Sequence, residues 1–157
     1  MALEFVDIRE VWDVIRPGLE LIQSETNPDW RIEDVYASCV NKHSFLLMDT
    51  ARTASGFTVV ETKSHPFRDK TIMLVWIAYD PVPNSVPTYQ SQLEALALQT
   101  GHSEIQVMTP HRGLWKSAES AGYTMRWAML SKKLEGDTCH SAAAAIPGSG
   151  NQEVKEL

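Results

Sequence analysis

The first forty residues place apolar side chains at helical spacing. After Asp7-Ile8-Arg9-Glu10, apolar positions recur every three or four residues on one face of a helix: Val11, Val14, Ile15, Leu19 and Ile22. Pro17-Gly18 interrupts this pattern, which therefore predicts two short helices or one kinked helix. A second helix is predicted to begin at Asn27-Pro28, because Asn caps helices and Pro suits the first turn. Its apolar face consists of Ile32, Val35, Tyr36 and Cys39.

Strand patterns come next along the chain. Residues 44–49 form a short apolar run and residues 57–62 are rich in β-forming side chains. Thr71–Tyr79 is the longest apolar run, which predicts a central strand buried on both faces. Helices are predicted at about 87–100 and 110–121, with strands at 104–108 and 123–130. The order α-α-β-β-β-α-β-α-β predicts an α/β fold class, with an α+β mixed sheet.

Composition bounds the class of protein. The chain has 157 residues, 43% of them hydrophobic, which suits one globular domain, predicted at residues 1–134. Residues 135–157 hold few apolar side chains and are predicted to be a flexible tail. Fourteen basic against twenty acidic residues argue against a nonspecific nucleic-acid binder. No apolar run is long enough to span a membrane, and the N-terminus does not read as a signal peptide. Cys39 and Cys139 are expected to be reduced, in the cytoplasm.

This order of elements, and the stretch from Thr71 to Leu130 in particular, resembles the GNAT superfamily of acyl-CoA-dependent N-acyltransferases. The resemblance rests on the long strand ending at Tyr79, the helix ending near Gly101, the strand Glu104–Met108 and the turn Ser120-Ala121-Gly122-Tyr123. It implies a GNAT-like fold with an additional N-terminal strand near Leu3–Ile8. It also implies that acetyl-CoA would bind beside the long strand and at the start of the following helix.

The sequence departs from the family where the chemistry lies. The family's loop after the long strand has glycines that let backbone N–H groups approach the cofactor diphosphate. Here residues 80–87 contain three prolines and no glycine, and no Arg or Lys lies between Lys70 and Arg112. The family's proton-donating tyrosine in the last helix corresponds to Ala118, and His111 stands at its asparagine position. Thr71–Tyr79 contains no acid, so Glu61 and Glu104 are the nearest carboxylates, and both are expected to point to solvent.

Two functions are compatible with these observations. The first is a catalytically degenerate GNAT-like protein that acts through contacts with other protein subunits, with no cofactor and no catalytic residue; fold-level analogy with small phage-encoded proteins suggests a virion or assembly component. The alternative is an active acetyl-CoA-dependent N-acetyltransferase on an amine. In that case the backbone of Ile77 and Tyr79 would pair with the pantetheine arm, and Ser85 and Thr88 would hold the phosphates. An enzyme should show an open cleft between the strand ends at Tyr79 and Met108.

Other side chains carry weaker signals. The five histidines show no metal-ligand spacing, so no metal site is predicted. The segment from Lys63 to Lys70 is predicted to be a basic hairpin loop, either a solvated turn or a contact for a partner. Trp30 and Phe67 are the apolar side chains expected to be exposed on the monomer and covered in an assembly.

Overall fold

The computed structural model describes residues 3–50, 56–82, 86–109 and 112–126. The chain divides into two compact units, Met1–Thr124 and Met125–Leu157, and every described helix and strand belongs to the first. The predicted domain boundary after Leu134 and the predicted tail lie outside the described residues. The elements, in chain order, are β1 (Leu3–Val6), α1 (Ile8–Thr26), α2 (Ile32–Val40), β2 (Ser44–Asp49), β3 (Phe57–Ser64), β4 (Thr71–Tyr79), α3 (Val86–Gln99), β5 (Glu104–Val107) and α4 (Arg112–Ser120).

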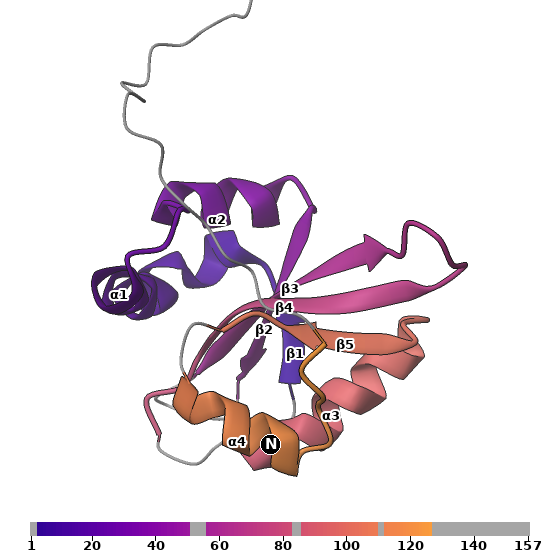
Figure 1. The fold of residues 1–157 in the computed structure, drawn as a ribbon. Helices are drawn as coiled ribbons and strands as arrows, with labels where there is room; N and C mark the ends of the chain where they lie inside the picture. Colours follow the sequence, from indigo (N-terminus) through magenta and orange to yellow (C-terminus); the bar gives the residue numbers. More distant parts are fainter. Residues whose placement is uncertain (1–2, 51–55, 83–85, 110–111, 127–157) are drawn as a thin grey trace, which may run out of the picture. The chain divides into compact units, whose positions relative to one another are not determined.

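The five strands form one mixed sheet in the order in which they occur along the chain. β1 to β4 pair antiparallel, and β5 joins β4 in parallel after the α3 crossover. Helices α1 and α2 cover one face and α3 covers the other (Figure 1). This confirms the predicted fold class and the N-terminal strand that the resemblance implied. No described helix is both long enough and apolar enough to cross a membrane.

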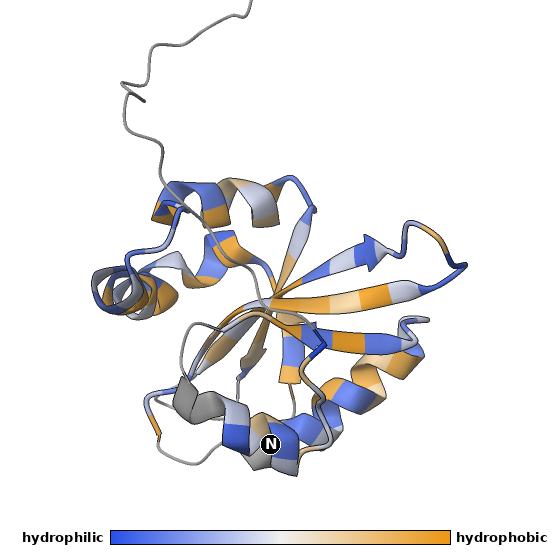
Figure 2. Cartoon of the chain, viewed as in Figure 1, coloured by the Kyte–Doolittle hydropathy of each residue, from blue (hydrophilic) through white to orange (hydrophobic). Residues whose placement is uncertain are grey.

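The sheet separates two apolar cores. Between the sheet and α1–α2 lie Ile8, Ile15, Leu19, Ile32, Val35, Leu46, Met48, Phe57, Val59 and Ile77. Between the sheet and α3 lie Leu47, Val60, Met73, Val75, Leu93 and Ala97. β4 contributes to both cores, as a strand buried on both faces should, and its hydropathy is evident in Figure 2.

Helix α1 is one continuous element with Pro17 inside it, not two short helices. Proline removes one backbone hydrogen bond, but Ile15 and Leu19 on either side of it are almost fully buried, and this packing holds the helix together. Asp7 caps the helix: its carboxylate accepts from the Arg9 N–H at 3.0 Å.

The predicted start of the second helix at Asn27-Pro28 is wrong. Asn27 instead ends α1, in a left-handed conformation with φ of 42°, and its N–H donates to the Gln23 carbonyl. Asn tolerates this conformation better than other non-glycine residues, so it can close a helix as well as open one. Helix α2 begins at Ile32, where Asp34 accepts from the Arg31 N–H.

The C-terminal part of this unit differs from prediction in its last strand. Helix α4 ends at Ser120, and Gly122, with φ of 87°, turns the chain so that the Tyr123 N–H reaches the Ala118 carbonyl. The glycine-aromatic turn is therefore present. Residues 123–126 do not form the predicted strand, and the rest of it, 127–130, lies outside the described residues, as does the predicted helix start at 110–111.

Candidate functional site

Strands β4 and β5 part halfway along β4. Their parallel pairing runs from Ile72 opposite Glu104 to Val75 opposite Val107, and the Met108 N–H makes a last contact with the Val75 carbonyl at 3.3 Å. β4 continues through Trp76–Tyr79, still paired with β3, while the described residues give it no further β5 partner. The described pairing of β4 with β5 thus ends four residues before Tyr79, the last residue of β4.

A β-bulge lies at the point of divergence. Val59 pairs with Ile77 and Val60 with Val75, so Trp76 is an extra residue in β4. The bulge reverses the alternation of the strand: Val75 faces the α3 core, whereas Ile77 faces the α1–α2 core. Trp76 also packs against that core, with its ring edge-on to Trp30 at 6.2 Å between centroids.

The predicted site residues Ile77 and Tyr79 lie together at this divergence. Their side chains are committed to packing: Ile77 is buried, and the Tyr79 ring lies 5.5 Å from that of Phe57. What they can present to a ligand between the strands is therefore main chain, as the resemblance implied. The predicted residue Ser85 lies outside the described residues, and Thr88 lies in the first turn of α3.

The described start of the β4–α3 connection carries a hydrogen-bonded carboxylate. The Asp80 carboxylate accepts from the Val82 N–H at 2.8 Å, which occupies one backbone donor of the loop. A Cβ on Gly56 would lie 2.6 Å from the Tyr79 carbonyl oxygen, so glycine at this position allows the chain before β3 to lie close to the end of β4.

No proton acceptor is supplied at the divergence by β4. Glu61, on the neighbouring strand β3, lies opposite Leu74, one residue before Val75, where the described pairing of β4 with β5 ends. The expectation that Glu61 points to solvent is wrong: its side chain is only 16% exposed, and it accepts from the Ser44 hydroxyl at 3.1 Å and pairs with Lys63. Strand register brings Ser44 opposite Glu61 and so covers it. Glu104 is half-buried and accepts from the Gln106 amide at 3.0 Å.

Trp30 is not the exposed anchor that was expected. It is half-buried against the α1–α2 core, because it precedes α2 rather than opening it and so lies within reach of Trp76. Phe67, by contrast, is 91% exposed, as predicted.

Sequence reasoning missed a buried carboxylate. Asp49, at the end of β2, is 1% exposed and accepts from the Tyr89 hydroxyl of α3 at 3.0 Å. The only signal was an acid directly after an apolar run. The Cys39 thiol is an unsuitable nucleophile, since burial and then the charge of Glu61 raise its pKa to about 11. Among the described residues no cluster of His, Cys, Asp or Glu is arranged to hold a metal ion.

A five-stranded mixed sheet with one parallel pair, two helices on one face and a crossover helix on the other, is a GNAT-like fold. Comparison with solved structures agrees. A protein described as a probable acetyltransferase superposes with a TM-score of 0.65 at 14% identity, over 85% of this chain and 97% of that one. The ribosomal-protein-alanine N-acetyltransferase of Brucella melitensis biovar Abortus 2308 superposes with a TM-score of 0.65 at 13% identity, over 85% of this chain and 100% of that one.

An aminoglycoside acetyltransferase from an uncultured soil metagenomic sample, solved with sisomicin, gives a TM-score of 0.61 at 10% identity, over 85% of this chain and 95% of that one. No protein-family model and no curated protein sequence matches the chain. At these identities the likeness establishes the GNAT fold and leaves the activity to be argued from the site.

Proposed function

We propose that this chain is a GNAT-fold protein that has lost acyl-CoA chemistry and acts by binding other protein subunits. The observation that carries the proposal is the β4–α3 connection, where the Asp80 carboxylate occupies the Val82 N–H at 2.8 Å. A cofactor diphosphate needs free donors and positive charge at this place. The sequence adds three prolines and no cation between Lys70 and Arg112.

The chemistry at the strand divergence supports the same proposal. Amine acetylation needs a group that takes a proton from the attacking amine, within hydrogen-bond reach of it or through one water. Trp76–Tyr79 bear no carboxylate and no imidazole. The carboxylate of Glu61, the nearest acid on β3, already accepts from the Ser44 hydroxyl and pairs with Lys63. A viral assembly is one setting for such a protein, by fold-level analogy alone.

The second candidate is an acetyl-CoA-dependent N-acetyltransferase on an unidentified amine. It is favoured by the parting of β4 and β5 beyond Val75, which leaves a stretch of β4 main chain for a ligand. Ile77 and Tyr79 would hold the pantetheine arm through backbone groups, and Ser85 and Thr88 would face the phosphates. When bound, acetyl-CoA would supply the activated acyl group.

Thermal unfolding with and without acetyl-CoA separates the two. A ligand at 100 times its dissociation constant adds about 2.7 kcal/mol, which raises the midpoint of a domain of this size by roughly 5–10 °C. The first proposal expects no rise at millimolar acetyl-CoA, with AMP as the control for nucleotide binding. A rise that the nucleotide control does not reproduce overturns it in favour of the enzyme.

Two matched variants sharpen the result. Asp80→Asn removes the negative charge from the loop, whereas Asp69→Asn removes an exposed charge from the distant β3–β4 hairpin. If Asp80 is what excludes the diphosphate, acetyl-CoA should stabilise Asp80→Asn more than the parent chain, and should not stabilise Asp69→Asn more. If acetyl-CoA changes the unfolding midpoint of all three proteins equally, the charge of Asp80 does not exclude the diphosphate.

A further inference from the structure

An apolar pocket opens on the α3 side of the sheet, away from the strand divergence. Its volume is about 240 Å³, and its lining includes Phe5, Phe45, Val60, Thr62, Met73 and His102. The rings of Phe5 and Phe45 meet edge to face at 6.0 Å, and these side chains stay 50% and 40% exposed. Two aromatic rings thus stand uncovered at the mouth of a pocket whose floor, Val60 and Met73, is buried.

The polar groups of the pocket already have partners. The Thr100 hydroxyl donates to the Leu96 carbonyl at 2.8 Å, so it accepts from Nδ1 of His102, also at 2.8 Å. Nε2 of His102 then accepts from the Thr62 hydroxyl at 2.9 Å. Because both ring nitrogens are satisfied, the pocket has few hydrogen bonds to offer and favours an apolar occupant.

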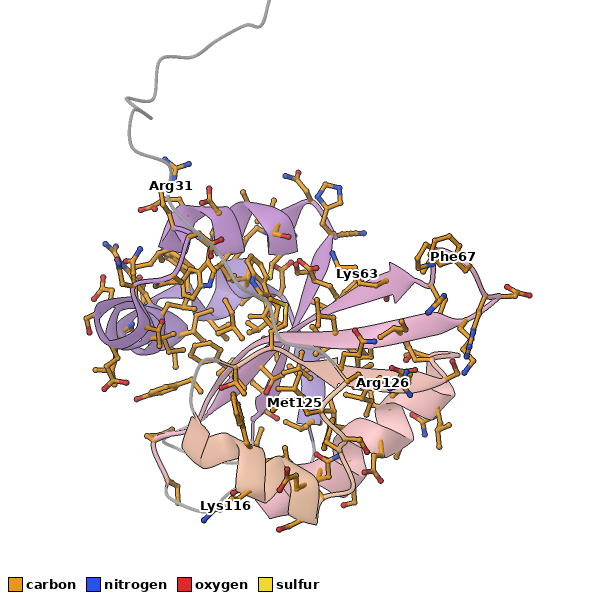
Figure 3. The ribbon with its side chains drawn as sticks, viewed as in Figure 1. Arg31, Lys63, Phe67, Lys116, Met125 and Arg126 are labelled. Carbon is orange, nitrogen blue, oxygen red and sulfur yellow. The ribbon has the colours of Figure 1, made fainter. Side chains whose placement is uncertain are left out.

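The β3–β4 hairpin presents an exposed aromatic side chain. Phe67 stands at the tip and is 91% exposed (Figure 3). The hairpin backbone beneath it is held in place: the Phe67 N–H donates to Nδ1 of His65 at 3.2 Å, and the His65 N–H donates to the Lys70 carbonyl at 2.9 Å. Because this backbone is already ordered, little backbone entropy is lost when the ring enters a pocket.

We propose that the pocket receives Phe67 of a second copy of this chain. A volume of about 240 Å³ accommodates a phenyl ring, and the pocket supplies the apolar and aromatic surface that such a ring prefers. The electrostatics of the hairpin and the pocket also favour this contact. Arg68 and Lys70 lie close to Phe67 in the hairpin, whereas the last turn of α3 beside the pocket carries no basic residue to offset its carbonyl dipole.

The geometry favours a closed pair. Thr62 lines the pocket, and the hairpin leaves the sheet only a few residues further along the same strand. Tip and pocket therefore lie at the same end of the molecule, so two copies related by a twofold axis can each insert Phe67 into the other. The contact is small, which predicts a dimer weaker than an obligate one. This pairing goes beyond the proposed function, since it holds whether or not acetyl-CoA binds.

Sedimentation velocity of the full chain, from micromolar to about millimolar concentration, tests the pairing. Phe67→Ser should raise the dimer dissociation constant about tenfold or more, as removal of a central aromatic anchor does. Val14→Ser is the matched control, since Val14 is an apolar side chain of α1, 60% exposed and on the other face of the sheet. It should change the constant by less than about twofold. A chain that stays monomeric throughout, or a dimer that Phe67→Ser leaves intact, overturns the proposal.

A cross-linking experiment tests the partner site directly. In a Cys139→Ser background, Phe67→Cys and Phe45→Cys proteins are oxidised separately and as a mixture. The proposed contact expects a disulfide-linked pair in the mixture, at several times the yield of either protein alone. Equal yields in all three samples would show that Phe67 does not enter the pocket. Circular dichroism of each variant confirms that it is folded before the comparison is made.

Discussion

Replacing Gly18 with alanine sets two physical effects against each other. Gly18 lies in the middle of α1, where glycine costs about 1 kcal/mol relative to alanine, so helix propensity alone predicts that the change stabilises the protein. The structure predicts the opposite. A Cβ at position 18 would lie 2.8 Å from Cε1 of Phe57 and 2.8 Å from Cδ1 of Tyr79, where a normal carbon contact is about 3.5–4.0 Å.

The size of the effect depends on the surroundings of the added methyl group. Phe57 is 2% exposed and packs against Tyr79, so neither ring can move aside without disturbing the α1–α2 core. Overpacking of this kind costs about 1–3 kcal/mol. After the gain in helix propensity, Gly18→Ala should destabilise the protein by up to about 2 kcal/mol, which lowers Tm by up to about 8 °C.

Urea denaturation and thermal unfolding measure this directly. Ser24→Ala, on the exposed face of the same helix, is the control and should stay within about 0.5 kcal/mol of the parent. In a Phe57→Leu background, where the ring is replaced by a smaller side chain, Gly18→Ala should cost at least about 1 kcal/mol less. A Gly18→Ala protein more stable than the parent would show that α1 does not approach β4 as described.

Three further predictions concern single side chains. In a Cys139→Ser background, Cys39 should react with a disulfide reagent at pH 8 about a hundredfold or more slower in the folded protein than after unfolding in urea. The reason is that the pKa of its thiol is raised to about 11 in the folded protein. Rapid labelling of the folded protein would contradict the burial of Cys39. Hydrogen bonds from Arg9 lower the pKa of Asp7 to about 2 from 3.8, so its stabilisation is complete above pH 4 and lost between pH 4 and 2. Asp7→Asn should flatten Tm against pH in that window, and an unchanged curve would refute the assignment. Tyr89→Phe removes a hydrogen-bond donor from buried Asp49 and should lower the free energy of unfolding, measured in urea, by about 1–3 kcal/mol. An unchanged free energy would mean that apolar contacts alone hold α3.

Local patterns in the sequence were enough for most strands. The run Thr71–Tyr79 was predicted with the bounds that the structure gives, because an uninterrupted apolar run of that length suits a strand buried between two layers. Asn27 was misassigned because its side chain suits both ends of a helix, and only the packing of Trp30 and α2 decides between them. Local signals specify elements better than they specify boundaries.

The site was less accessible to sequence reasoning because it depends on register. The bulge at Trp76 has no local signature, since it exists only as a mismatch between β3 and β4. The covering of Glu61 likewise depends on Ser44 lying opposite it. The departures in the loop after Tyr79, by contrast, were visible as composition, and Asp80 adds a hydrogen bond that the sequence alone does not specify.

The strand order has a consequence for how the protein folds. Strands β1 to β4 have the same order in the sheet as in the chain, and short connections join β2 to β3 and β3 to β4. β5 can pair only after the α3 crossover has formed, and among the described strands it pairs only with β4. Loop closure makes such late parallel pairing slow, and a strand held on one side opens more readily than one held on both. In native-state hydrogen exchange, amides of β3 and β4 should therefore outlast those of β5. Among the described strands, β5 should therefore form last and open first.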